Sequence, residues 1–443
     1  MSRQIITSLA ALVAGLPAYA LASPVNSLYN FTGSPDGAHP IGALVADSAG
    51  NLYGTTTAGG NNSVNGTNVG TVDIVGPPPP PTGVGIVFEL SPPAAGSSTW
   101  TETILYTLQG GTTGAYPVAG SLAIDAKGNL YGTTEFGGYK NGGMVFELVK
   151  HKKKGVTTWT ETKLTEFNGN LKLTLPNAPN GAVVFGPDGA LYGTTSAGGA
   201  HNQGVVYRLA LPHTLSVIYN FGANSTDGTT PYGSVVFDKA GNLYTPTTAG
   251  GNTGNGTVVE LSPPAAAGAG WTETVLHSFD INFDGGAPRM GLTIDANGNL
   301  YGTTEQMANN AATGQGAVYE ISPPAAGRTK WTETVLYIFP QNGTEGASPG
   351  FSTVTIDKSG NLYGTTERGG AYSGERVGGT LWRLSPSTTG RGSWTQTTLN
   401  DFTAAPDPAA PQSGVIFTSN GDLVGTTIYG GADNIGTVYS YTP

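Results

Sequence analysis

Three glutamates stand at the same position of a recurring motif and are the first residues of this sequence that could do chemistry. Glu135, Glu305 and Glu367 each directly follow a Thr-Thr pair. Grouped carboxylates can bind Ca²⁺ or act as a general acid and a general base. In the other copies of the motif this position holds Thr57, Ser196, Thr248 and Ile428. The glutamates form either a partial acidic ring or a set of repeat residues that accept backbone amides within their own loops.

A second set of candidates flanks a recurring proline and varies from copy to copy: His39, Tyr116, Tyr232 and Arg289. An arginine can pair with an anionic group, and a tyrosine ring can stack on a sugar. The alternative is that these side chains simply decorate exposed loops. Arg368, next to Glu367, is interpreted equally well as the ion-pair partner of Glu367 or as a ligand contact.

Known catalytic signatures are absent from the sequence. It has no cysteine, which excludes disulfides, thiolate metal sites and cysteine nucleophiles. It also lacks G-x-S-x-G with a triad, H-E-x-x-H, a P-loop and an EF-hand loop. The five histidines are scattered at His39, His151, His201, His213 and His277. We therefore predict no cofactor and leave Ca²⁺ open as the one candidate cation.

The charge and composition limit the class of partner. The net charge is −10 and the pI is about 4.9, so the surface repels phosphate backbones and nucleic acid is not an expected partner. The sequence holds 69 glycines and 30 prolines, and 38% of its residues are hydrophobic. Short strands joined by Gly- and Pro-rich turns fit this composition.

The motif that carries the glutamates occurs seven times. The string GNLYGTT stands at residues 50–56, 128–134, 298–304 and 360–366, and variants stand at 189–195, 241–247 and 421–427. Each copy divides into four apolar segments of strand type, which we call a to d. An Asp-x-x-Gly turn joins segments a and b, as in residues 125–128. The recurring tryptophans of segment d, such as Trp159 and Trp271, are expected to pack between neighbouring units.

The two ends of the chain indicate that the repeats close into a ring. The last copy stops after its c segment at residues 437–441, and an unaccompanied d segment stands at residues 25–31. We predict a single domain, residues 23–443, folded as an all-β, seven-bladed β-propeller with four antiparallel strands per blade and 28 strands in total. The N-terminal strand would complete the last blade. An open β-solenoid is the competing fold, but it does not explain the position of the extra segment.

The motifs D-x-x-G-N-L-Y-G-T-T-x-x-G-G, G-x-V-x-E-L-S-P-P and W-T-E-T-x-L together resemble the bacterial GloVer tandem repeat. That repeat occurs in exported "choice-of-anchor" proteins, so the resemblance implies an exported protein and covers nearly all of the chain after residue 22. A looser similarity, at the level of the fold alone, links the a–b hairpin to NHL and streptogramin-lyase-like propellers. The resemblance implies no reaction, so it assigns no catalytic residue.

The first 22 residues are typical of a signal peptide. Arg3 precedes an apolar stretch at residues 5–16, and small residues offer cleavage after Ala20 or Ala22. We expect a secreted or periplasmic monomer that has neither a membrane span nor a C-terminal sorting anchor.

Function is expected on one face of the propeller. The d–a and b–c loops vary most among the copies, and variable loops on a rigid scaffold usually carry function. The sequence favours a binding or scaffold module for a glycan or protein ligand. The alternative is an extracellular hydrolase or lyase that acts on a carbohydrate at the channel mouth, with Glu135, Glu305, Glu367 and Arg289 as its polar core. A purely structural surface-layer component is a third hypothesis.

Overall fold

The computed structural model describes residues 25–61, 83–117, 122–138, 140–168, 175–266, 269–306, 315–340, 345–371, 378–387, 394–403 and 405–443. The predicted signal peptide, residues 1–22, lies outside these ranges and stays a prediction. No helix in the described ranges is long and apolar enough to cross a membrane.

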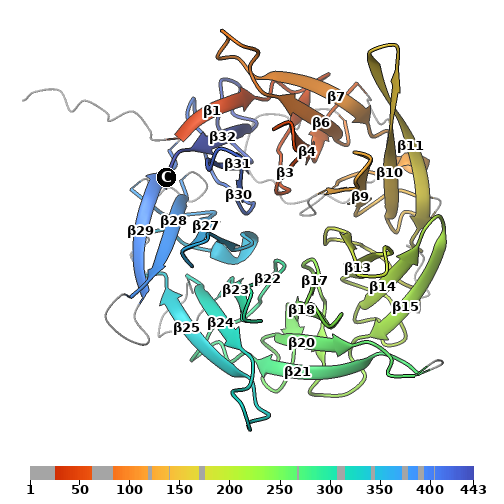
Figure 1. Cartoon of the computed structure of the whole chain (residues 1–443), viewed down its shortest axis with the longest axis vertical. Helices are drawn as coiled ribbons and strands as arrows, with labels where there is room; N and C mark the ends of the chain where they lie inside the picture. The colour runs from red at the N-terminus through yellow and green to blue at the C-terminus, as the bar shows by residue number, and fades with distance from the viewer. Residues whose placement is uncertain are drawn as a thin grey trace, which may run out of the picture.

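Seven four-stranded antiparallel sheets are arranged in a ring around a central axis (Figure 1). Blade 1 contains β3 (Val45–Ala46), β4 (Leu52–Thr56), β6 (Ile86–Ser91) and β7 (Thr101–Thr107). Blade 2 contains β8 (Ala123–Ile124), β9 (Leu130–Thr134), β10 (Met144–Lys153) and β11 (Val156–Glu166). Blade 3 contains β12 (Val184–Phe185), β13 (Leu191–Thr195), β14 (Val205–Ala210) and β15 (Thr214–Asn220). Blade 4 contains β17 (Val236–Phe237), β18 (Leu243–Thr247), β20 (Thr257–Ser262) and β21 (Thr272–Ser278).

Blade 5 contains β22 (Thr293–Ile294), β23 (Leu300–Thr304), β24 (Ala317–Ser322) and β25 (Thr332–Ile338). Blade 6 contains β26 (Thr355–Ile356), β27 (Leu362–Thr366), β28 (Thr380–Pro386) and β29 (Trp394–Asp401). Blade 7 contains β30 (Ile416–Phe417), β31 (Leu423–Thr427), β32 (Thr437–Tyr441) and β1 (Val25–Asn30). Two-residue ladders pair β2 (Gly37–Ala38) with β5 (Ala58–Gly59) and β16 (Gly228–Thr229) with β19 (Ala249–Gly250). Short 3₁₀ turns occur at η1 (Gly111–Thr113) and η2 (Pro349–Phe351).

The predicted seven-bladed propeller and its 28 blade strands are confirmed. The innermost a strands are only two residues long, shorter than the segments that the repeat suggested. Each a strand follows a d–a loop and is followed directly by the a–b turn.

The two chain ends close the ring as predicted. β1 pairs antiparallel with β32, from Val25 opposite Tyr441 to Asn30 opposite Thr437, and the sheet order is β1-β32-β31-β30. Phe31 directly follows β1 and is fully buried in the core between blades 7 and 1. Figure 1 shows β1 beside β32, so an open solenoid is excluded.

One aspartate organises the a–b hairpin in five of the seven blades. In blade 1, Asp47 Oδ1 accepts the amides of Ala49 (2.9 Å) and Asn51 (3.0 Å). Its Oδ2 accepts the Asn51 side-chain amide (2.9 Å) and the Tyr53 hydroxyl (3.0 Å). Gly50 takes the left-handed conformation that closes the turn, with φ of 86°. Asp125, Asp238, Asp295 and Asp357 make the same set of bonds.

The tyrosine held by this carboxylate packs against the next blade. The Tyr53 ring contacts Trp159 edge-on, with ring centroids 6.4 Å apart. Tyr192–Trp271 and Tyr244–Trp331 repeat this contact at 6.2 and 5.9 Å. The expectation that the outer-strand tryptophans pack between blades is therefore confirmed for these pairs.

Carboxyl groups are partly buried in several grooves between blades. Between blades 3 and 4, the Tyr219 hydroxyl donates to Asp227 Oδ2 (3.1 Å), and Glu273 of β21 lies against both side chains. Between blades 7 and 1, Tyr29 donates to Asp36 Oδ2 (3.1 Å) beside Glu102 of β7. Burial, reinforced by the neighbouring aspartate, raises the pKa of Glu102 and of Glu273 to about 7. Each glutamate is therefore protonated when the pH is below neutral.

These glutamates make the stability of the propeller depend on pH. Because their folded-state pKa of about 7 exceeds the ordinary value of 4.5, the native state holds more protons than the unfolded state between these limits. The free energy of unfolding is expected to fall as the pH rises through this window. Thermal unfolding should show a lower midpoint at pH 7.5 than at pH 5, by roughly a few degrees. A Glu102→Gln/Glu273→Gln double variant should flatten this slope, and an unchanged slope would contradict the assignment.

Ring closure predicts that β1 stabilises the whole fold. A chain that begins at residue 32 is expected to unfold at least about 5 °C below a chain that begins at residue 25, because it loses a paired strand and the buried Phe31. It should also aggregate more readily, because β32 becomes an open edge. As a control, deleting Lys152, Lys153, Val156 and Thr157 shortens an exposed hairpin but keeps its Lys154–Gly155 turn, and should leave the midpoint within about 2 °C. Equal effects of the two changes would count against closure by β1.

Candidate functional site at the channel mouth

The segments just before the a strands, which are rich in small residues, come close together around the central axis. Between them lies a cavity of about 20 Å³ lined by Ala43, Gly181, Tyr232, Gly233, Ser234, Met290, Gly291, Thr353 and Gly414. A Cβ built on Gly233 would lie 2.5 Å from the carbonyl carbon of Met290 in the next blade. A space of this size holds about one water molecule. A larger ligand does not fit into this cavity, which leaves the loops at the mouth of the channel as the candidate binding surface.

The residue before the recurring proline has the left-handed conformation in every blade. These residues are His39, Tyr116, Ala178, Thr230, Ala287, Ser348 and Ala410, with φ between 52° and 57°. His39 and Tyr116 thus occupy a repeated backbone position, which the variable residue types hid in the sequence. The loop then joins the b–c loop of the same blade, because the amide of Glu135 donates to the Tyr116 carbonyl (2.9 Å).

The side chain of His39 is held against the b–c loop of blade 7, across the ring closure. It is buried, its Nδ1 lies 2.9 Å from the Ile428 carbonyl, and its ring packs edge-on against Tyr429. Burial lowers the pKa of His39, so the imidazole is neutral near pH 7. The Tyr116 ring packs edge-on against Phe136, with centroids 5.9 Å apart.

Tyr232 and Arg289 are brought together with a third residue, Phe351. The three follow the recurring proline in blades 4, 5 and 6. The Arg289 guanidinium carbon lies 5.3 Å from the Tyr232 ring centroid and 5.1 Å from the Phe351 ring centroid. A guanidinium at this distance from a ring face is attracted by the ring quadrupole. The sequence analysis missed Phe351, because the extra residue of η2 moves it one place further from its proline than Tyr232 and Arg289 are from theirs.

Two of the predicted glutamates join this cluster. Arg289 Nε lies 2.9 Å from Glu305 Oε2, in a partly exposed ion pair. Glu135 lies close enough to raise the pKa of both Tyr116 and Tyr232, although burial is the larger cause in each case. Burial also raises the pKa of Glu135 itself, and among the described residues no side chain or amide binds its carboxylate. We call Glu135, Tyr232, Arg289, Glu305 and Phe351 the mouth cluster.

Glu367 and Arg368 are engaged elsewhere on the rim. Gln412 donates to Glu367 Oε1 (2.8 Å), and Arg368 Nε lies 3.7 Å from Glu367 Oε2. The interpretation of Arg368 as the partner of Glu367 is thus supported, and 58% of the Arg368 side chain is exposed. Within the described residues, the three glutamates do not meet as a metal-binding group.

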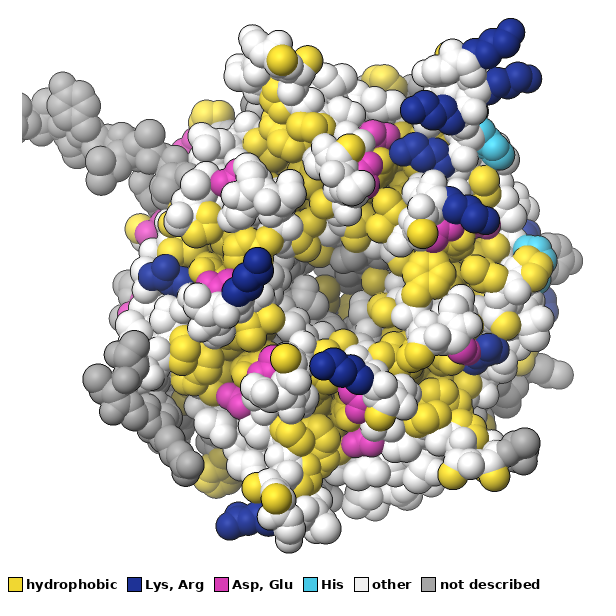
Figure 2. Space-filling model, in the orientation of Figure 1, with side chains coloured by type: hydrophobic (Ala, Val, Ile, Leu, Met, Phe, Trp, Pro, Cys, Tyr) yellow, Lys and Arg dark blue, Asp and Glu magenta, His cyan; other side chains and the backbone are white. Residues whose placement is uncertain are grey.

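One face of the molecule is hollowed at its centre (Figure 2). Neutral side chains cover most of this face, and charged side chains are few and scattered around the hollow. This distribution agrees with a sequence in which only 11% of residues are charged.

A family model for the Gloeobacter/Verrucomicrobia repeat matches residues 65–312, 156–374 and 269–443. The chain belongs to this repeat family. The sequence matches no curated protein.

Several solved structures are similar to this chain at low sequence identity. A family PL25 ulvan lyase, a polysaccharide lyase, is 9% identical with a TM-score of 0.53, over 94% of this chain and 95% of that one. The BP39L lectin of Burkholderia pseudomallei is 9% identical with a TM-score of 0.49, over 91% and 95%. The periplasmic gluconolactonase PpgL of Pseudomonas aeruginosa is 15% identical with a TM-score of 0.45, over 80% and 90%. At these identities the likeness concerns the fold alone.

Because neighbouring blades lie close together around the axis, we expect that the small residues there cannot be replaced by larger ones without loss of stability. Gly233→Ala places a methyl group against the backbone of blade 5 and is expected to cost about 1–3 kcal/mol in the free energy of unfolding. Gly270→Ala is the matched control, because a Cβ there meets nothing within 4 Å. Denaturant unfolding of both variants compares them directly. A Gly233→Ala variant as stable as Gly270→Ala would show that the blades are not tightly packed around the axis.

Proposed function

We propose that this protein is a saccharide-binding propeller whose ligand sits on the mouth cluster. The observation that carries the proposal is the stack of Tyr232, Arg289 and Phe351, contributed by three consecutive blades. At the corresponding position Asn180 and Gln412 each donate a hydrogen bond to a b–c loop side chain, so the backbone of the ring does not require an aromatic or cationic residue there.

The chemistry of the cluster suits a sugar. Tyrosine and phenylalanine rings offer apolar faces to the C–H face of a pyranose, and the tyrosine hydroxyl can also bond to a sugar hydroxyl. The Glu135 and Glu305 carboxylates accept hydrogen bonds from hydroxyl groups, and the guanidinium donates them. Stacking rings combined with a few convergent polar groups are typical of small-molecule sites.

The same residues support a second function, cleavage of a saccharide. Glu135 is partly buried and has no partner among the described residues, and burial raises its pKa, which suits a general acid. Glu135 lies close enough to Tyr232 to influence its hydroxyl, and the Arg289 guanidinium in turn lies over the Tyr232 ring. We also propose that the chain acts outside the cytoplasm, with residues 1–22 as its export signal.

The binding proposal is tested with a glycan array followed by titration of the best ligand. Tyr232→Ala and Arg289→Ala should each weaken binding at least about tenfold, because each removes a stacking partner from the cluster. Arg208→Ala is the control, since Arg208 pairs with Asp188 at an a–b turn, away from the mouth loops. The proposal fails if no saccharide binds, or if both mouth variants bind as tightly as Arg208→Ala.

Cleavage is distinguished from binding by Glu135→Gln. If the protein cleaves the saccharide that it binds, this variant should lose at least about 100-fold in turnover while its affinity changes little. Release of reducing ends, or of unsaturated product absorbing in the ultraviolet, measures turnover. Binding without turnover in the unaltered protein identifies a binding module.

A further inference from the structure

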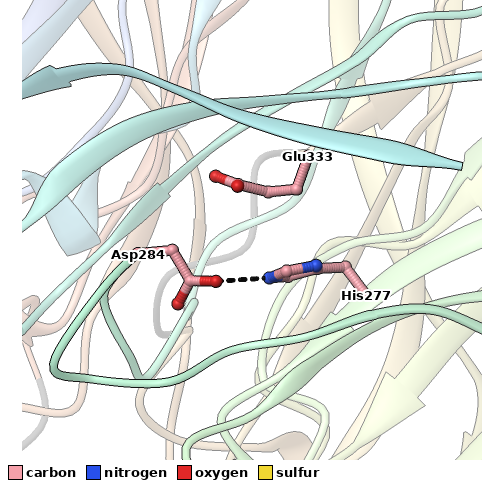
Figure 3. Close-up of side chains that lie close together, drawn as sticks. All are labelled: His277, Asp284 and Glu333. Atoms are coloured by element: carbon pink, nitrogen blue, oxygen red, sulfur yellow. Dashed lines mark hydrogen bonds and ion pairs between the residues drawn. The ribbon is translucent and has the colours of Figure 1, made fainter.

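A second cluster of functional side chains lies in the outer groove between blades 4 and 5. His277 is the next-to-last residue of β21, Asp284 lies in the loop from β21 to β22, and Glu333 stands near the start of β25 (Figure 3). One ligand atom from each residue lies within 4.8 Å of the others. Figure 3 shows the three side chains pointing toward one another from three separate segments.

Comparison with the other grooves shows what is special here. The position of His277, opposite the second residue of the c strand, holds a tyrosine in four other blades: Tyr29, Tyr106, Tyr219 and Tyr337. The grooves that contain Tyr29 and Tyr219 also hold an aspartate and a glutamate, but a tyrosine hydroxyl completes them. His277 replaces that hydroxyl with an imidazole nitrogen, a much better ligand for a transition metal.

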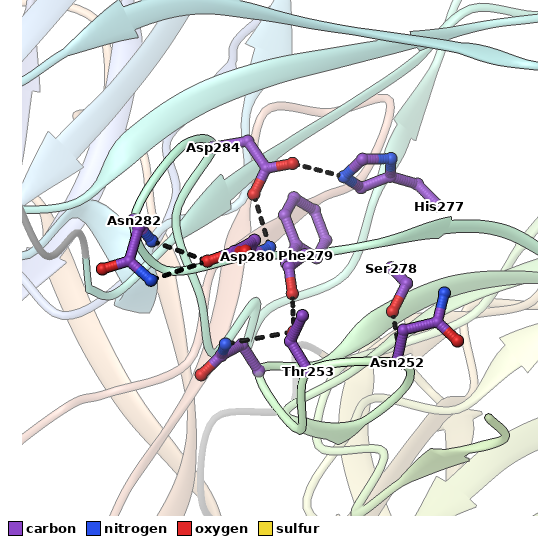
Figure 4. A network of polar contacts seen from close by, with 9 residues as sticks. Asn252, Thr253, His277, Ser278, Phe279, Asp280, Asn282 and Asp284 are labelled. Atoms are coloured by element: carbon purple, nitrogen blue, oxygen red, sulfur yellow. Dashed lines mark hydrogen bonds and ion pairs between the residues drawn. The ribbon is translucent and has the colours of Figure 1, made fainter. Parts of the chain in front are cut away.

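The ligand atoms are already oriented. His277 Nε2 lies 2.8 Å from Asp284 Oδ2, and the amide of Asp280 donates to Asp284 Oδ1 (2.7 Å). Asn282 in turn binds Asp280 through its amide and its side chain, as Figure 4 shows. The His277 ring also rests edge-on against Phe279, with centroids 4.8 Å apart. Such outer contacts fix the direction of metal ligands and strengthen binding.

Glu333 presents an unused acceptor to this cluster. Its Oε1 is buried and has no hydrogen-bond partner among the described residues. An open cleft of about 580 Å³ borders the cluster and is lined by His277, Trp331 and Glu333 among others. The cleft gives an ion access from solvent and leaves space for a further ligand. Arg328 and Lys330 also line the cleft, but within the described chain neither forms an ion pair with Glu333.

We propose that His277, Asp284 and Glu333 form a binding site for a divalent transition metal of the Zn²⁺ type. One imidazole and two carboxylates suit Zn²⁺ better than Ca²⁺ or Mg²⁺, which prefer oxygen ligands alone. The ion takes the place of the proton between His277 and Asp284, and a small movement of Glu333 completes a three-ligand set. Three protein ligands leave a fourth position open toward the cleft, for water or a ligand group. The site is on the outer strands and does not depend on the function of the channel mouth.

The test is a titration of the chelator-treated chain with ZnCl₂ by calorimetry, with thermal unfolding in parallel. The unaltered chain should bind one equivalent and unfold at a higher temperature when Zn²⁺ is present. His277→Tyr, which installs the residue of the other blades, should weaken Zn²⁺ affinity at least about 100-fold while the metal-free chain unfolds as before. Glu333→Gln provides a second loss variant that does not depend on how the tyrosine packs.

A gain-of-site variant makes the test sharper. Tyr219→His places an imidazole beside Asp227 and Glu273, which copies the cluster into the groove between blades 3 and 4, and should add a second equivalent of Zn²⁺. The proposal is overturned if the unaltered chain binds no Zn²⁺, or if His277→Tyr and Glu333→Gln both bind Zn²⁺ as tightly as the unaltered chain.

Discussion

The propeller depends on one aspartate that recurs in five of its seven a–b hairpins. An aspartate such as Asp47 accepts two backbone amides, a side-chain amide and a tyrosine hydroxyl at once. The first bonds close the turn, and the last fixes the tyrosine that contacts the tryptophan of the next blade. A single group thus links local folding to packing between blades. Since the chain has no disulfide, this link and the strand ladders must hold the ring together.

Threonine hydroxyls of the b strands also link neighbouring blades around the axis. Thr133 donates to the Gly181 carbonyl of the next blade, and Thr426 donates across the closure to Gly42. In blade 4 the residue at this position is Pro246, which has no hydroxyl to donate. These bonds join neighbouring blades close to the axis, so the loops of the channel mouth stand on a firmly held inner ring.

Most of the fold could be predicted from the sequence, but only part of the site. The seven motifs and the displaced d segment determined the blade number and the closure, because a four-stranded blade leaves no other partner for residues 25–31. Tyr232 and Arg289 stood out as departures from the repeat, and Glu305 as a carboxylate at a recurring position, and these three do meet. Phe351 could not be found by alignment, because a 3₁₀ turn shifts it by one residue. His277, Asp284 and Glu333 come from two blades and the loop between them, so no motif spacing indicates that they meet.

In a repeat protein, a residue that differs from those at the equivalent position of the other repeats is a candidate for a functional role. The equivalent positions must be taken from the strand pairing in the structure. His277 looked like one of five scattered histidines until strand pairing placed it where four other blades carry tyrosine. His39 looked like a departure, but its backbone conformation recurs in every blade. The first comparison added a candidate metal ligand, and the second showed that a variable residue type can occupy a purely structural position. In a closed ring the useful comparison is therefore between spatially equivalent grooves and loops. Equivalent positions have the same packing requirements, so a residue type that packing does not explain points to a functional role.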